Sequence, residues 1–130
     1  MKKGIILLVG VAMLTACHES LEERAEREAK EFTEKNCPTP VRENTRTDSL
    51  TYDKESRTIG YWYTLCGQAD NAEAIEADKE KLVGILRNEL KASTQMKAYK
   101  DAGFRIRYVY HSEKNPQQVL LDVVFSEKDY

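Results

Sequence analysis

The sequence predicts an α+β fold in which helices cover one face of a four-stranded, mostly antiparallel sheet. Three observations lead to this prediction: helical spacing of apolar residues over 21–35, the same spacing over a longer segment between 70 and 103, and period-two alternation in four other segments. The element order is α-β-β-α-β-β. Two layers accommodate this order, because each element then buries its apolar side against the other layer.

The first helix is expected over residues 21–35. Ser20 followed by Glu23 is typical of a capping box. The apolar stripe behind it is thin and mostly alanine, so we expect only Phe32 and its neighbours to pack firmly. Acid–base pairs four residues apart should support the exposed sides of the helix. These pairs are Glu23 with Arg27, Glu26 with Lys30, and Glu31 with Lys35.

Two β-hairpins are expected on either side of the second helix. Pro38 and Pro40 end the first helix. Segments 46–53 and 57–66 then alternate around a turn at 53–56, and segments 104–111 and 119–125 alternate around a turn at 115–116. The hairpins could pair through either edge, so the strand order stays open. A crossover between neighbouring parallel strands should be right-handed.

The second helix is expected to begin at a capping box of Asp70 and Glu73 and to end before Gly103. Its broad apolar stripe makes it the main cover of the core. Ser93 and Thr94 predict a bend, which would divide it into a long and a short segment. Gly84 lies opposite the stripe, where glycine costs about 1 kcal/mol relative to alanine, and the pattern gives no packing reason for it.

The N-terminus is typical of a secretory signal peptide. Lys2 and Lys3 precede an apolar run over 4–14 that is too short for a stable transmembrane span. Residues 14–17 (Leu-Thr-Ala-Cys) resemble the lipobox of bacterial lipoproteins. The resemblance implies cleavage after residue 16 and acylation of Cys17, whose fatty acyl chains (palmitate among them) would hold the protein on a membrane. The alternatives are a cleaved signal with an incidental cysteine and an uncleaved apolar helix.

Removal of residues 1–16 leaves one expected domain, 17–130, with an N-terminal tethered helix. Those 16 residues contain two lysines and no acid, so 18 basic residues remain against 22 acidic ones, a formal charge near −4. This charge argues against nucleic acid and anionic lipid surfaces as partners. His18 after the lipidated cysteine resembles lipoproteins passed to the outer membrane, in a leaflet that the sequence does not specify.

With Cys17 assigned to lipid, Cys37 and Cys66 remain in an oxidising compartment, and we expect them to form a disulfide. Closing this loop of about 30 residues contributes roughly 3 to 4 kcal/mol in the chain-entropy model. A redox pair and a zinc site are weaker alternatives. A redox pair usually has Cys-x-x-Cys spacing, and zinc needs more ligands than these cysteines and His111 provide.

Five tyrosines are expected on the helix side of the sheet, where they could line a groove for a small ligand or a peptide. Alternatively their rings fill the core, and their hydroxyls reach water or bond Arg46 and Asp48, which share that side by strand parity. The five are Tyr52, Tyr61, Tyr63, Tyr108 and Tyr110.

The opposite sheet face is expected to carry Trp62, Arg105, Arg107 and His111, together with a few apolar residues. Tryptophan and arginine are enriched at binding hot spots, so this face is a candidate surface for a protein partner or for self-association. The alternatives are that the first helix covers Trp62 or that one exposed ring is incidental.

Several short motifs of the mature chain resemble a loose group of small exported or membrane-anchored bacterial proteins of unknown function. This resemblance implies one fold unit and no mechanism.

No nucleophile elbow, phosphate loop or zinc-binding helix is present, and His111 has only Asp122 beside it. We therefore expect no catalysis, no metal and no cofactor, but a membrane-anchored interaction or structural module. The motifs that carry the resemblance to this group of exported proteins are Cys-Pro at 37–38, Thr-Arg-x-Asp at 45–48, Tyr-x-Tyr-Thr-Leu at 61–65 and Gly103 before Tyr-x-Tyr at 108–110.

Overall fold

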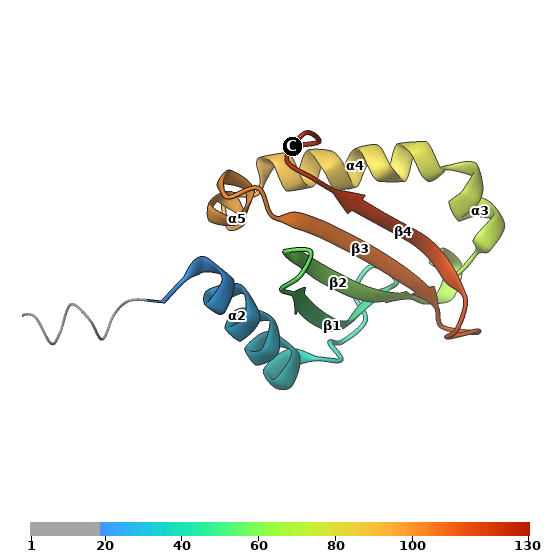
Figure 1. Cartoon of the computed structure of the whole chain (residues 1–130). Coiled ribbons are helices and arrows are strands. Elements are labelled where there is room, and N and C mark those ends of the chain that lie inside the picture. Colours follow the sequence, from blue (N-terminus) through green and yellow to red (C-terminus); the bar gives the residue numbers. More distant parts are fainter. Residues whose placement is uncertain (1–18) are drawn as a thin grey trace, which may run out of the picture.

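The computed structural model describes residues 19–130 and has the expected element order (Figure 1). The helices are α2 (Leu21–Asn36), α3 (Ala72–Ala77), α4 (Lys79–Ala92) and α5 (Lys97–Asp101), with a short 3-10 turn at Gly67–Ala69. The strands are β1 (Thr45–Asp53), β2 (Thr58–Leu65), β3 (Arg105–Ser112) and β4 (Val119–Phe125). The signal peptide, Cys17 and His18 lie outside the described residues.

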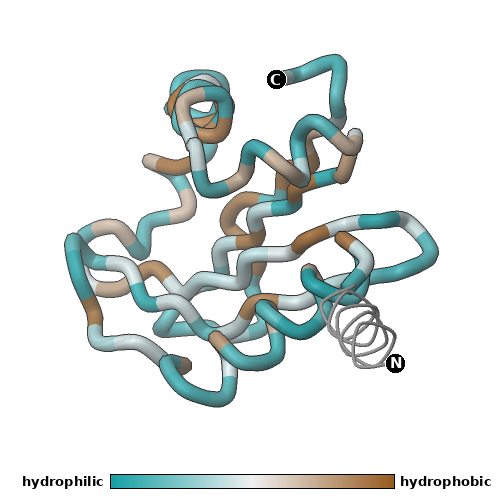
Figure 2. Tube along the Cα trace, turned by 90° about the vertical axis from the view of Figure 1, so that its left-hand side faces the viewer, coloured by the Kyte–Doolittle hydropathy of each residue, from teal (hydrophilic) through white to brown (hydrophobic). Residues whose placement is uncertain are grey.

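The four strands form one sheet in the order β1-β2-β3-β4. β1–β2 and β3–β4 pair antiparallel, and β2–β3 pair parallel. The predicted α+β class with a mostly antiparallel sheet is therefore confirmed, and the structure resolves the strand order that the sequence left open. The core lies between the sheet and the helices, and Figure 2 shows hydrophobic segments at the centre of the molecule and along α4. Its buried residues are Ala25, Ile59, Leu90, Tyr99, Phe104, Ile106 and Phe125.

The start of α2 confirms the predicted capping box. The Glu23 amide donates to the Ser20 hydroxyl, 3.1 Å, and the Ser20 amide donates to the Glu23 carboxylate, 3.4 Å. The predicted i,i+4 ion pairs are wrong. Arg27 instead bonds Glu19, 2.8 Å, and contacts Glu31, while Glu26 contacts Lys54 of the β1–β2 turn, 3.2 Å. Lys30 and Lys35 form no ion pair with any residue over 19–130. Helical spacing therefore permits these pairs without enforcing them.

The packing of α2 also differs from the expectation. Ala25 and Ala29 are the buried residues of this helix, whereas Phe32 is 37% exposed. Small side chains bring the helix backbone close to the sheet, and Thr33 fixes this approach by hydrogen bonds with the backbone of Leu50 on β1. The alanine stripe is therefore the firm contact.

The second predicted helix is three helices. Asn71 rather than Asp70 caps α3, and its side chain accepts from the Ala74 amide, 3.1 Å. The Asp70 carboxylate accepts instead from the Lys114 amide in the β3–β4 connection, 3.0 Å. A break at Asp78 was not expected. The predicted bend at Ser93–Thr94 is confirmed, and Lys100 of α5 donates to the last carbonyls of α4.

α5 ends at Asp101, and Gly103, two residues later, has φ 76°, a left-handed conformation that favours glycine. The chain then enters β3 through Phe104, which is fully buried. Within the described residues, no helix has the length and apolarity required to cross a membrane.

Candidate functional site

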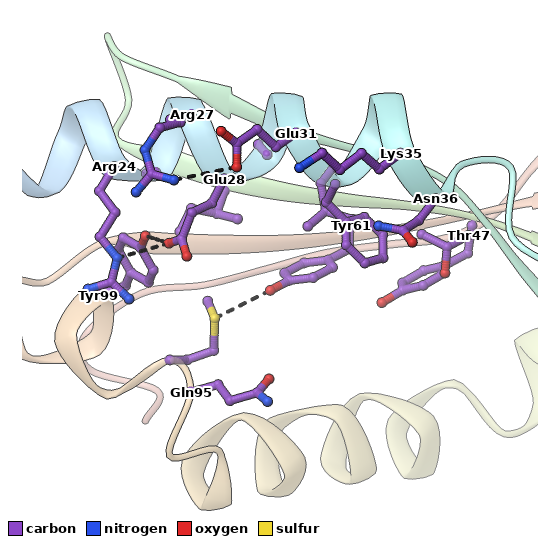
Figure 3. A pocket seen from close by; sticks show the side chains of 17 residues that line it. Arg24, Arg27, Glu28, Glu31, Lys35, Asn36, Thr47, Tyr61, Gln95 and Tyr99 are labelled. Carbon is purple, nitrogen blue, oxygen red and sulfur yellow. Dashed lines mark hydrogen bonds and ion pairs between the residues drawn. The ribbon is translucent and has the colours of Figure 1, made fainter.

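A groove of about 670 Å³ runs between α2 on one side and the α4–α5 junction on the other. Tyr61 and Tyr63 of β2 form its floor, and Figure 3 shows the two helical walls facing each other across it. The groove exists because α2 packs on β1, at one edge of the sheet, while α4 packs on β4, at the other. The side chains between these two contacts are left uncovered by either helix.

The α2 wall combines apolar and charged groups. Ala25, Ala29 and Phe32 face the groove from this helix, and Arg27 and Lys35 stand at its rim. The opposite wall is made by the α4–α5 junction, because the helix break places Gln95 and Met96 there. This wall contacts the floor through Tyr61, whose hydroxyl donates to Met96 Sδ, 3.3 Å.

One end of the groove is closed by a contact between the two walls, which we name the clasp. Its residues are Arg24 and Glu28 of α2 and Tyr99 of α5. The Tyr99 hydroxyl donates to the Glu28 carboxylate, Arg24 bonds the same carboxylate, 3.0 Å, and the Arg24 guanidinium lies 5.5 Å from the Tyr99 ring centre. The other end has no such contact and is lined by Phe32, Lys35 and Asn36 (Figure 3).

Four of the five predicted tyrosines stand side by side on β2 and β3. The ring centres of Tyr63 and Tyr110 are 4.8 Å apart, those of Tyr61 and Tyr108 5.3 Å, and those of Tyr61 and Tyr63 6.3 Å. Tyr52 is separate from this row and stacks on Phe104, 5.7 Å. Of the five tyrosines considered for a groove, Tyr61 and Tyr63 line it, and Tyr52, Tyr108 and Tyr110 do not.

Burial raises the pKa of all four phenols of the row, that of Tyr110 to about 12. The row is therefore uncharged at neutral pH. Within the groove, Tyr61 and Tyr63 offer uncharged aromatic surface to a ligand.

Arg46 and Asp48 do not reach these tyrosines, although simple strand parity predicts that they share a face. A β-bulge between Thr47 and Ser49 adds one residue to β1 and reverses the direction of the side chains before it. As a result, Arg46 and Asp48 both bond Thr64, which alternates with Tyr63 along β2 and faces the other way. Sequence pattern alone gives no signal for this bulge.

The opposite sheet face, which we call the open face, is not covered by α2. The Trp62 indole N–H donates to Thr51 Oγ1, 2.8 Å, and the Arg107 guanidinium lies 5.2 Å from the indole centre. Arg107 forms two hydrogen bonds with Asp122, 2.9 and 2.7 Å. His111 stacks beside Trp62 with ring centres 6.2 Å apart. The Asp122 carboxylate, the only acid that the sequence placed beside His111, thus accepts from Arg107.

The predicted Cys37–Cys66 disulfide is not formed in this structure, where both residues are free thiols. The Cys66 thiol is buried and donates to the Thr64 carbonyl, 3.9 Å. Burial raises the pKa of both thiols, and the nearby Asp48 carboxylate adds to the effect. Both sulfurs are therefore protonated at neutral pH.

Sequence reasoning did not identify the residues that form the two walls of the groove. Phe32 is expected to pack firmly and Met96 to belong to the apolar stripe of the second helix, whereas both line the groove, and the pattern gives no role to Gln95. The only sequence signal was the pair Ala25 and Ala29, because two small residues one turn apart allow a helix to approach a sheet and leave larger neighbours at the rim.

The fold is similar to those of several solved structures. A protein from Pseudomonas aeruginosa that is described as secreted matches with a TM-score of 0.70 and 15% identity, over 86% of this chain and 98% of that chain. EpsS, a pilotin of the type 2 secretion system of Vibrio vulnificus, matches with 0.62 and 14%, over 84% and 90%. AspS, the type II secretion system pilotin of Vibrio cholerae, matches with 0.59 and 15%, over 85% and 92%.

At these identities the likeness shows a shared fold. No curated protein matches the chain significantly. A family model described as a domain of unknown function, DUF8479, matches residues 20–121, and the chain therefore belongs to this family.

Proposed function

We propose that the protein is a non-catalytic module, anchored to the outer membrane by lipid on Cys17, whose groove binds a segment of another envelope protein. The observation that carries the proposal is the groove between α2 and the α4–α5 junction. It leaves Phe32, a large apolar side chain, 37% exposed beside the aromatic floor. Exposed apolar surface with a polar rim is typical of an interaction site.

The chemistry of the groove suits an amphipathic segment. Apolar side chains of the partner would meet Phe32, Met96 and the tyrosine floor, while its polar side would face the charged rim of α2. The rim carries both signs, with Arg27 and Lys35 beside Glu31. A segment of this kind binds through spaced apolar anchors, with the rim deciding its direction.

A small molecule is the alternative occupant. The open end at Phe32 and Asn36 favours a longer ligand, since nothing among the described residues closes the groove there. Catalysis has little support, because no histidine, cysteine or serine is among the residues that line the groove. The similarity of the fold to pilotins supports a protein partner within the cell envelope, such as a component of a secretion system.

The anchor has its own test. Only three residues separate Cys17 from Leu21, where α2 begins, so the lipid would hold the domain close to the bilayer. Cys17→Ala should move the protein from the membrane fraction to the soluble fraction and remove the lipid mass. A variant that still fractionates with membranes, with no lipid mass on the wild type, contradicts the tether.

The groove is tested by site-specific photo-crosslinking in intact cells. A photoreactive residue at position 32 should capture one defined protein, whereas the same residue at position 119, on the exposed Val119 of β4, should not. Phe32→Glu should lower the affinity for that protein at least about tenfold, because it places a charge in an apolar contact. Equal capture from both positions, or no effect of Phe32→Glu beside a matched Val119→Glu control, contradicts the proposal.

A further inference from the structure

A second hollow lies on the open face, directly over Gly60. Its volume is about 330 Å³, near the lower end of the range for small-molecule sites. No helix contributes to it, and its walls come from all four strands. They include Thr51, Thr58, Trp62, Arg105, Arg107 and Asp122.

Gly60 is required for this arrangement. A Cβ atom at position 60 would lie 2.6 Å from Thr51 Oγ1 and 3.0 Å from Trp62 Nε1. The Trp62 indole can therefore lie over position 60 of β2 and bond Thr51 on β1 only because position 60 has no side chain. The hydrogen bond and the neighbouring Arg107 fix the ring, so the hollow has a rigid aromatic wall before any ligand arrives.

The charges around the hollow nearly cancel. Arg107 is paired with Asp122, and Asp53 also lines the hollow. Arg105 is exposed and forms no ion pair with any residue over 19–130. The walls therefore select little for net charge, yet they present guanidinium donors, carboxylate acceptors and the hydroxyls of Thr51 and Thr58.

We propose that this hollow binds a sugar ring of an uncharged glycan. A pyranose has C–H groups that pack on an aromatic ring and hydroxyls that both donate and accept, which matches a rigid indole surrounded by donors and acceptors. The two arginines and two aspartates offset one another, so the hollow gives an anion no advantage over a neutral ligand. A large apolar partner would have to cover paired charges at a desolvation penalty. The cell-envelope origin of the glycan rests on the proposed function, but the sugar chemistry does not.

Trp62 is the only tryptophan of the chain, so its fluorescence reports on the hollow directly. The probe is the β-1,4-linked tetramer of N-acetylglucosamine, titrated into the mature protein, with co-sedimentation on insoluble chitin, the uncharged polymer of the same sugar, as a second measurement. We expect a saturable change in emission and retention on the chitin. Arg105→Ala should weaken both about tenfold through loss of a charged donor. The exposed Arg42, outside the hollow, supplies the control Arg42→Ala, which should bind like wild type.

Three results would overturn the assignment. The first is no change in emission and no retention of wild type. The second is an equal response to inorganic phosphate, which would indicate a simple anion site. The third is a wild-type dimer that Trp62→Phe dissociates while circular dichroism stays native, which would assign the face to self-association. Phe32→Glu in the groove should leave sugar binding unchanged, so failure of the groove proposal and failure of the glycan proposal remain distinguishable.

Discussion

The two faces of the sheet bury their residues in different ways. On the helix face, Ile106 is 0% exposed because helices cover it. On the open face, Val109 is 1% exposed although none of the helices described over 19–130 covers it. Its neighbours on that face are Trp62, Arg107, His111 and Asp122, which contact one another by stacking and hydrogen bonds. A fixed layer of polar side chains can thus bury a residue without a second layer of secondary structure.

The comparison predicts unequal stability contributions. Phe104 is fully buried on the helix side and packs against Tyr52 and Tyr99. Phe104→Ala should reduce the free energy of unfolding by about 3 to 5 kcal/mol, because it removes a whole buried ring. Val109→Ala should reduce it by about 2 kcal/mol, because it removes only two buried methyl groups. Urea unfolding of both variants measures the difference. Equal losses of stability would mean that packing under the polar layer contributes as much to stability as packing under the helices.

Oxidation should strengthen the helix face, because a Cys37–Cys66 bond would tie the end of α2 to the end of β2. We expect the bond in exported protein, with about 3 to 4 kcal/mol of stability in the chain-entropy model. Non-reducing peptide mapping detects it, and thermal unfolding with and without reductant measures the gain. Two free thiols in correctly exported protein would show instead that the free-thiol state seen here is the native one.

The packing of the helix face should lose stability at alkaline pH. Burial raises the pKa of Tyr110 to about 12, above the value near 10 of an unfolded tyrosine. The native state therefore retains protons that the unfolded state loses, so stability is complete below pH 10 and falls as the pH rises toward 12. Absorbance of the phenolate against pH should show this late titration. Tyr110→Phe should reduce the alkaline loss by the share of Tyr110, since the pKa values of Tyr61, Tyr63 and Tyr108 are also raised. An unchanged loss would assign all of it to other groups.

The open face should respond in the opposite direction. Hydrogen bonds from Arg107 lower the pKa of Asp122, so the contribution of this pair is complete above the unfolded pKa near 4 and is lost as the pH falls through the native pKa. Both side chains are more than a third exposed, so Asp122→Asn should destabilise by only about 1 kcal/mol at pH 7. The difference from wild type should vanish on acidification. A difference that persists at pH 2 would point to packing rather than charge.

The smallest effect concerns a position in neither face. A Cβ atom on Gly84 of α4 would have no heavy atom within 4 Å. Gly84→Ala should therefore raise the free energy of unfolding by up to about 1 kcal/mol through helix propensity alone, with both binding surfaces unchanged. Chemical denaturation measures this gain. A loss of stability would reveal a need for glycine at this position that the structure does not show.

Local pattern determined much of this fold. Period-two alternation located all four strands, the Ser20–Glu23 pair marked the start of α2, and Ser93–Thr94 marked the break between α4 and α5. These signals are reliable because they depend on contacts within four residues or on the regular alternation of a strand. The sequence also predicts the signal peptide and the lipid on Cys17, which lie outside the described residues.

Tertiary structure decided the rest, because those features depend on neighbours distant in sequence. A single bulged residue in β1 moved Arg46 and Asp48 to the open face, and no periodicity reveals one extra residue. Asp70 bonds Lys114 across 44 positions instead of capping its own helix. The groove exists only because α2 and α4 pack on opposite edges of the sheet. The strand order places β1 and β4 at those edges, and neither helix sequence predicts this by itself.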